Sequence, residues 1–369
     1  MNPRPAPGRG LERALLAALA GAAMALLGAP SPAAGISKDP AVPVDVARRE
    51  GLPRKVLLGT VVCGPDFFAL PLGARLVRMD ETVDKIAAQG ASEYPGKRLD
   101  LVVLPEAYLE HPGDTVSVQA VKLADIQERI GACARRHGCY LVVPAILAES
   151  DPSRYSNTAL LIDRSGAVAG IYRKVHPVAP QGSDIVETGT APGGSFPVFD
   201  CDFGRLGIQI CFDMLYPDGW AALARQGAEI VALPSASPQT TYPSLYALEH
   251  RYYVVSAVPR DHAAVYSPVG IIEKEATQEG TIVDEIDLSY ALIHWEAVLE
   301  EGEAFRRAFG DRAGFHYYRD QDTGIFWSND PAMPISRMMA KLGLIEVDAN
   351  ADRVRALQDR ARGGPPVSP

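Results

Sequence analysis

The sequence predicts an α/β fold built around a mixed β-sheet, and three observations support this. From residue 55 onward, short apolar runs of strand length alternate with amphipathic segments of helical period. Strand pairs in the middle of the chain predict antiparallel neighbours, which a purely parallel sheet would lack. Hydrophobic residues make up 47% of the 369 residues and charged residues 22%, which is typical of globular chains and argues against disorder, a collagen-like repeat or a coiled coil.

The first half of the predicted domain alternates strands with helices. Its strands are short apolar runs in which Val and Leu are frequent. Its helices carry apolar residues at three- and four-residue steps, and Gly138 stands where the second of them should end. These patterns predict a strand at 55–62, a helix at 75–89, a strand at 99–104, a helix at 118–136 and a strand at 139–146.

The second half is richer in strands. The turn Arg164-Ser165-Gly166 joins two of them into a hairpin. The patterns predict strands at 158–163, 167–174 and 206–212, a helix at 219–225, a strand at 230–234, and further strands at 253–258 and 281–286.

Residues 290–369, the C-terminal extension, differ in character because aromatic residues are mingled there with charged and turn residues. We expect this segment to be appended to the main domain. It could cover the core, a partner subunit or the substrate entrance, and the sequence does not choose among these. Its final Gly363-Gly364-Pro365-Pro366 is predicted to fray.

Residues 1–34 have the order of a secretory signal peptide. Arg4, Arg9 and Arg13 precede an apolar run at 14–27, and a stretch of Pro, Ser and Ala follows. We expect the peptide to be removed and the protein to be exported, periplasmic or secreted, with no stable membrane span after processing. An uncleaved membrane anchor and a disordered leader on a cytoplasmic protein are the alternatives.

Charge and cysteine content narrow the function classes. The formal net charge of -9, with no long block of like charge, argues against a nucleic-acid partner. Five cysteines are too few, and odd in number, for a disulfide framework in a chain of this length. At least one thiol should therefore be free.

Cys211 is a candidate nucleophile because it lies near the end of a predicted strand. A thiol there is lifted out of the sheet, and the backbone N–H groups beyond it can point at a developing oxyanion. A cysteine needs a neighbouring base or positive charge to react at neutral pH. Taken alone, Cys211 is more often a buried structural cysteine.

Glu106 also ends an apolar strand, where an unpaired carboxylate would be costly to bury. Lys174, at the end of another strand-like run, is the partner that we expect. Each residue taken singly favours an ordinary ion pair at a sheet edge. The three residues together favour a catalytic site.

Three segments, taken in order, resemble the signature segments of the nitrilase, or carbon-nitrogen hydrolase, superfamily. The resemblance extends from about residue 55 to 289 and implies a hydrolase domain at 52–289. It also implies a four-layer αββα sandwich, which usually pairs into a homodimer or a higher homo-oligomer through its outer helices. The segments are Pro105-Glu106, Tyr172-Arg173-Lys174-Val175-His176 and Ile210-Cys211-Phe212-Asp213.

The resemblance assigns roles to these residues. Glu106 would accept the thiol proton of Cys211, which would attack the substrate carbon, while Lys174 would stabilise the tetrahedral intermediate. The backbone N–H of Phe212 is a plausible oxyanion donor. Glu187 is the best match to a second glutamate that often assists in this family, and its alternative is a solvated loop carboxylate. The implied reaction requires no metal and no other cofactor.

The nucleophile motif separates amide from nitrile substrates. True nitrilases usually have Trp-Glu after the cysteine, whereas Cys211-Phe212-Asp213 resembles the amide-hydrolysing branches. We therefore expect a small-molecule amide or carbamoyl amide as the substrate, with a nitrile as the alternative. Leu215 replaces an arginine common in those branches, so no carboxylate-binding role is assigned to that position. The segment after Val258 also departs from the family's pattern, and the substrate preference therefore stays open. An alternative of another class is a catalytically silent binding or assembly module.

Overall fold

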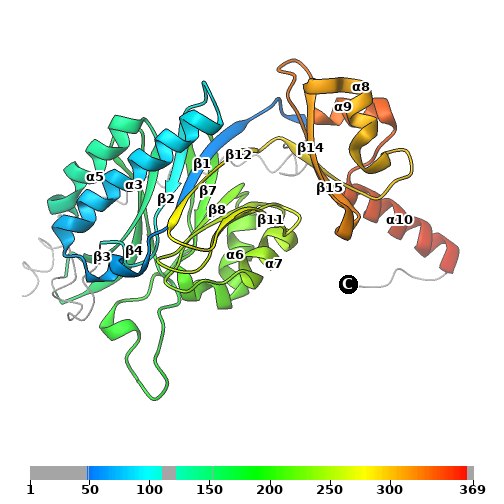
Figure 1. The fold of residues 1–369 in the computed structure, drawn as a ribbon. Coiled ribbons are helices and arrows are strands. Elements are labelled where there is room, and N and C mark those ends of the chain that lie inside the picture. Colours follow the sequence, from blue (N-terminus) through cyan, green and yellow to red (C-terminus); the bar gives the residue numbers. More distant parts are fainter. Residues whose placement is uncertain (1–47, 49, 110–121, 152, 364–369) are drawn as a thin grey trace, which may run out of the picture. The chain divides into compact units, whose positions relative to one another are not determined.

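The computed structural model describes residue 48 and residues 50–109, 122–151 and 153–363 (Figure 1). The predicted signal peptide lies outside the described residues, and so do residues 364–366 of the segment that is predicted to fray. The described part contains two six-stranded sheets and one three-stranded sheet. None of its helices is long and apolar enough to cross a membrane.

The first sheet has the strand order β12-β1-β2-β3-β4-β5. Its central strands β1, β2 and β3 are parallel, and β12, β4 and β5 each run antiparallel to their neighbours, so the sheet is mixed as predicted. The strands are β1 (Lys55–Val62), β2 (Leu99–Val103), β3 (Tyr140–Ala148), β4 (Tyr155–Ile162), β5 (Val168–Arg173) and β12 (Gly280–Asp287).

The second sheet has the order β11-β10-β9-β8-β7-β6. Strands β7, β8 and β9 are parallel, and the remaining pairs are antiparallel. The strands are β6 (Val198–Cys201), β7 (Gly204–Ile208), β8 (Ile230–Pro234), β9 (Tyr253–Ala257), β10 (Ala263–Tyr266) and β11 (Ile272–Ala276).

The two sheets face each other and each has helices on its outer side (Figure 1). Alternate residues of one strand face different layers: Val56 and Leu58 join the core between the sheets, whereas Leu57 packs in the core under the helices. Helices α3 (Leu72–Glu93) and α5 (Leu123–His137) cover the first sheet, and α6 (Pro217–Arg225) and α7 (Thr241–His250) the second. The predicted four-layer αββα sandwich is thereby confirmed.

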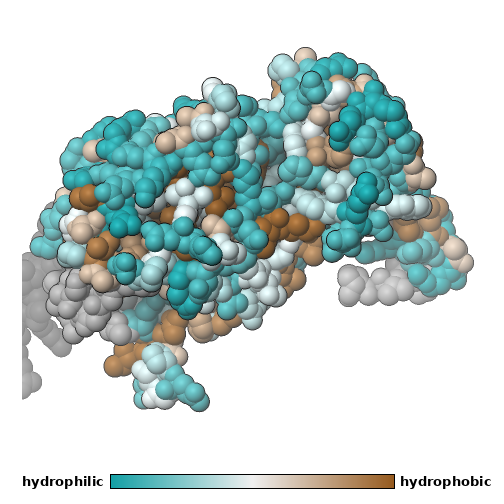
Figure 2. Space-filling view, in the orientation of Figure 1, coloured by the Kyte–Doolittle hydropathy of each residue, from teal (hydrophilic) through white to brown (hydrophobic). Residues whose placement is uncertain are grey.

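The outer helices are amphipathic. Side chains on the exposed surface of α3 and α5 are mostly hydrophilic (Figure 2), whereas Met79, Val83 and Ile130 are fully buried against the sheet. Gly138 ends α5 in the left-handed conformation, with φ 60°, as predicted. The predicted start of this helix at 118–121 lies outside the described residues.

One predicted strand was too long. Strand β7 ends at Ile208, not at residue 212, and Cys211–Leu215 form a short 3-10 helix, η3. Cys211 has a φ of 44°, which no β-strand residue adopts, so the chain must leave the sheet before it. The other short 3-10 turns are Pro65–Ala69, Glu187–Gly189 (η2), Glu300–Gly302, Gly310–Arg312 and Arg319–Gln321.

The C-terminal extension folds into a three-stranded antiparallel sheet with three helices. Its aromatic residues Phe305 and Phe326 are fully buried in a core of its own, together with Met338. Tyr290 and Leu292, in contrast, belong to the core between the two large sheets, so the extension also covers that core. The division of the chain at residue 289 stays a prediction. The elements are β13 (Tyr290–His294), β14 (Ala313–Tyr318), β15 (Thr323–Ser328), α8 (Glu303–Phe309), α9 (Ile335–Leu342) and α10 (Val347–Arg362).

Candidate active site

The structure brings Glu106, Lys174, Glu187 and Cys211 together between the two large sheets. Glu106 follows β2 and Lys174 follows β5, both in the first sheet, whereas Cys211 opens η3 just after β7 of the second sheet. Glu187 lies in η2, on the long connection between β5 and β6.

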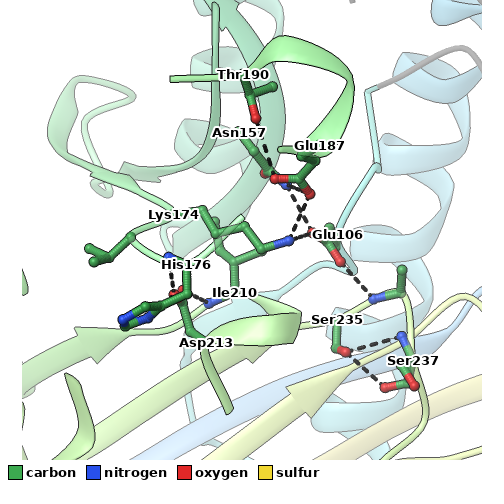
Figure 3. A network of polar contacts seen from close by, with 12 residues as sticks. Glu106, Asn157, Lys174, His176, Glu187, Thr190, Ile210, Asp213, Ser235 and Ser237 are labelled. Carbon is green, nitrogen blue, oxygen red and sulfur yellow. Dashed lines mark hydrogen bonds and ion pairs between the residues drawn. The ribbon is translucent and has the colours of Figure 1, made fainter. Parts of the chain in front are cut away.

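Lys174 stands at the centre of a charged cluster (Figure 3). Its Nζ lies 2.7 Å from Oε1 of Glu106 and 2.7 Å from Oε1 of Glu187, and only 1% of its side chain is exposed. Asn157 of β4 donates from Nδ2 to the same two carboxylates, at 2.9 Å each. Glu187 is therefore a member of this cluster and not the solvated loop carboxylate of the alternative prediction.

Burial and mutual charge shift the pKa values within the cluster. Burial acts against the charge on Lys174, but the two glutamates outweigh it and raise the pKa of the lysine above its usual value. Burial likewise disfavours an ionised Glu106, yet Lys174 and the hydrogen bonds to the carboxylate hold its pKa below the ordinary value. Burial raises the pKa of Glu187, and the charge of Glu106 adds to this effect while Lys174 opposes it.

The Cys211 thiol lies against this cluster. The Glu106 carboxylate, the Lys174 ammonium group and the Ser235 hydroxyl are all close enough to shift the pKa of its sulfur. Burial, followed by the negative charge of Glu106, raises the pKa of Cys211 to about 12, although Lys174 opposes this shift. The thiol is therefore protonated at neutral pH and has a base beside it that can accept the proton.

Backbone N–H groups complete the site. Phe212 lies in the first turn of η3, where its N–H has no earlier carbonyl of the same helix to bind. The N–H of Ala236, just beyond β8, donates to Oε2 of Glu106 at 3.0 Å and fixes the second carboxylate oxygen. One carboxylate oxygen of Glu106 thus contacts charged and amide side chains, while the other is held by backbone.

Strained backbone marks the same region. Ala107, Glu187 and Cys211 have φ values of 62°, 37° and 44°, in the left-handed region that favours glycine. Such conformations persist only where the surrounding structure holds them, and they are frequent at active sites.

Sequence reasoning missed three groups of the site: Asn157, Ser235 and the N–H of Ala236. Asn157 carried no clear signal, because it lies between Ser156 and Thr158 and directly before the predicted strand 158–163. Ser235 and Ala236 carried none, because they lie in an ordinary loop after β8 and reach the site only through the tertiary fold. Within the described residues, no group of three or more His, Cys, Asp or Glu side chains is arranged to hold a metal ion.

This cluster of charged groups beside a thiol, between two facing mixed sheets with outer helices, defines a class of hydrolase with an αββα fold, and the comparison with known proteins identifies the family. Residues 76–292 match the carbon-nitrogen hydrolase family. The chain belongs to this family and is a hydrolase of carbon–nitrogen bonds other than peptide bonds.

The chain is similar to curated amidases. It is 30% identical to omega-amidase NIT2-B of Xenopus laevis over 218 residues, which cover 53% of this chain and 79% of that protein. It is 28% identical to human deaminated glutathione amidase over 221 residues, which cover 52% of this chain and 67% of that protein.

Solved structures of the nitrilase superfamily share the fold. Nit3 of Saccharomyces cerevisiae superimposes with a TM-score of 0.55 at 23% identity, covering 70% of this chain and 95% of the other. An amidase from Nesterenkonia sp. AN1 superimposes with a TM-score of 0.51 at 22% identity, covering 62% and 91% of the two chains.

Proposed function

We propose that this protein is an exported, cysteine-dependent amidase that converts a small-molecule amide to an acid and ammonia or an amine. The observation that carries the proposal is that a protonated thiol, Cys211, meets the carboxylate of Glu106 and the ammonium group of Lys174, which lies 2.7 Å from that carboxylate, at one buried place. This arrangement supplies a nucleophile, a base and a fixed positive charge at one point.

The first half of the reaction forms a thioester. A thiol with a pKa near 12 costs about 7 kcal/mol to ionise at pH 7, so Glu106 accepts the proton as the sulfur attacks the carbonyl carbon, not before. Lys174 and the N–H of Phe212 stabilise the oxyanion. Glu106 then returns the proton to the departing nitrogen as the carbon–nitrogen bond breaks.

The second half releases the acid. Glu106, again ionised, takes a proton from water, whose oxygen attacks the thioester carbon. The carbon–sulfur bond then breaks, and the proton on Glu106 returns to the sulfur. Glu187 keeps Lys174 in place, because its Oε1 atom lies 2.7 Å from the ammonium nitrogen of the lysine.

An amide substrate is favoured over a nitrile. The similar curated proteins named above are called amidases, and Phe212-Asp213 after the nucleophile is typical of the amide-hydrolysing branches. A panel of amides and nitriles with product analysis separates the two. Conversion of a nitrile to its acid without amide turnover would favour the nitrilase alternative.

The test of the nucleophile is replacement of Cys211. We expect Cys211→Ala to lower kcat for amide hydrolysis by at least about 1,000-fold, because no other group in the site can form the thioester. Cys201→Ala is the matched control, since Cys201 lies in β6 away from the cluster; its kcat should stay within about twofold of the original. Ammonia release measures both. Undiminished turnover by Cys211→Ala would refute the mechanism, and a silent binding module would show no turnover in any form.

Export and assembly are further parts of the proposal. Residues 1–34 support export, and amino-terminal sequencing of protein from culture fractions tests whether the leader is removed. The outer helix α7 exposes Leu245 and Leu248, at 48% and 44%, which supports pairing of two copies through the outer helices. Light scattering tests the homodimer, and a monomer at assay concentration would contradict it.

A further inference from the structure

Asp213 makes hydrogen bonds to both sides of the catalytic site. Its side chain is fully buried. Oδ2 accepts from the N–H of Ile210 at 2.9 Å and from the hydroxyl of Tyr172 at 2.7 Å. Oδ1 accepts from the N–H of His176 at 2.9 Å and lies 3.0 Å from Nδ1 of the same residue. The contacts to Ile210 and His176 are visible in Figure 3.

These partners flank the reacting groups. Ile210 directly precedes Cys211, whereas Tyr172 and His176 lie two residues before and two residues after Lys174. The nucleophile turn belongs to the second sheet and the lysine segment to the first. One carboxylate therefore joins the two chain segments that carry the thiol and the ammonium group.

The contacts exceed what the local turn requires. A bond to the N–H of Ile210, three residues away, would by itself stabilise η3. The remaining acceptor positions of Asp213 are used by Tyr172 and His176, which are 41 and 37 residues away in sequence. Cys211 has the strained φ of 44°, and contacts with the surrounding structure must stabilise such a conformation.

We infer that Asp213 is a positioning residue that sets the distance between the Cys211 thiol and the Lys174 ammonium group by clamping η3 to the segment 172–176. The inference rests on the proposed function, because the clamp matters only if both groups react with the same substrate. Asp213 itself contacts neither the substrate carbon nor the thiol in this scheme.

Asp213→Asn tests the clamp with almost no change in volume. Every backbone and hydroxyl partner of Asp213 donates a hydrogen, so the NH₂ group of an asparagine must face a donor on one side of the clamp. That side opens. A misplacement of about 1 Å costs on the order of 100-fold in rate, so we expect kcat to fall about 100-fold while KM changes less than about threefold.

Two further variants separate positioning from simple loss of stability. Asp218→Asn is the matched control: Asp218 lies 3.6 Å from Nε2 of His176, is 61% exposed and has no bond to η3. It should keep kcat within about twofold. Tyr172→Phe removes one donor and keeps the carboxylate; it should lower kcat several-fold with KM unchanged, and it tests the clamp even if Asp213→Asn does not fold.

The outcomes are distinct. A lower melting temperature with unchanged kcat in Asp213→Asn, or unchanged kcat in a folded Tyr172→Phe, overturns the clamp. An equal loss of kcat in Asp218→Asn also overturns it, because the cause would then be the loss of a negative charge near His176. Cys211→Ala that retains activity overturns the proposed function instead, so the two failures can be told apart.

Discussion

The pKa values of the two glutamates on Lys174 shift in opposite directions, although both carboxylates lie 2.7 Å from the same ammonium group. Glu106 accepts hydrogen bonds from the Asn157 amide and from Lys174, and its pKa falls despite burial. Glu187 is close to the charge of Glu106, and its pKa rises. At the scale of single residues, the site therefore favours the ionised form more strongly at Glu106, the carboxylate nearest in effect to the Cys211 thiol, than at Glu187.

Asn157→Leu should move the acid limb of the activity profile to higher pH. The amide of Asn157 donates to ionised Glu106 at 2.9 Å and thereby favours the charged form. A hydrogen bond to a charged group contributes about 1.5 kcal/mol, so its loss should raise the pKa of Glu106 by about one unit. The pH dependence of kcat/KM measures the shift.

Thr158→Val is the control for that experiment. Thr158 is the next residue of β4 and donates to the carbonyl of Ala145, away from the cluster. The acid limb of the kcat/KM profile of Thr158→Val should lie at the same pH as in the unmodified protein. An unmoved limb in Asn157→Leu would mean that Glu106 is not the group whose ionisation limits the rate.

Among the elements, α5 illustrates how a single glycine sets a boundary. Gly138 follows α5 with φ 60°, and a Cβ atom added there would meet nothing within 4 Å. Replacement by alanine would therefore cost backbone strain alone, without any steric clash. The chain returns at once into β3, so the position of this turn also sets the start of the strand.

Gly138→Ala should destabilise the fold by about 1 kcal/mol, the usual cost of the left-handed conformation for a residue with a Cβ atom. Gly73→Ala is the control with the opposite sign: Gly73 lies in α3, has no positive φ and also has open space around it. It should stabilise by about 0.5 kcal/mol. Urea unfolding measures both, and equal shifts in the two variants would contradict the conformational explanation.

Elements whose boundaries depend on local patterns were predicted well. The bounds of β1 and β8 agree with the sequence prediction, because both are short runs of mostly apolar residues preceded by a charged residue, Arg54 or Glu229. Helix α7 was missed, because its apolar residues surround the axis: Tyr246 and Ala247 are buried, whereas Leu245 and Leu248 are exposed. No single apolar stripe was therefore visible in the sequence.

The site residues likewise fall into those that a local sequence pattern predicts and those that it does not. Glu106, Lys174 and Cys211 were predictable because each lies in a short, recognisable sequence motif. The roles of Asn157 and Asp213 depend on pairing between β4 and β5 and on contact between two sheets, and such long-range contacts leave no local pattern. The strand predicted through residue 212 was wrong for a related reason, since a strained φ has no signal in residue type.

In the molecule as a whole, a polar seam joins the two large sheets to the C-terminal extension. Glu273 of β11 accepts a hydrogen bond from Tyr318 of β14 and lies 2.8 Å from Nδ1 of His316. Asp284 of the adjacent β12 lines the same small cavity as Glu273 and His316. A change in the ionisation of one of these residues can therefore change the stability of the contact between the two large sheets and the C-terminal extension.

Asp284→Asn should stabilise the protein at neutral pH but not at acid pH. Burial raises the pKa of Asp284 to about 6, with Lys274 opposing and Glu273 adding to the shift. A carboxyl group with a raised folded-state pKa contributes stability below the unfolded-state value of about 3.9 and loses that contribution as the pH rises through the folded-state value. An asparagine has no such loss and keeps an acceptor for the hydroxyl of Tyr94, which lies 3.2 Å from Oδ1. The gain in unfolding free energy should therefore grow from near zero at about pH 4 to at most about 3 kcal/mol at about pH 7.5. Glu285→Gln is the control for that experiment. It replaces a carboxylate paired with a surface lysine at 2.8 Å, and its effect on the unfolding free energy should lack this pH dependence. Urea unfolding between about pH 4 and pH 7.5 measures both variants. A gain for Asp284→Asn that is equal at the two pH values would exclude ionisation as its cause.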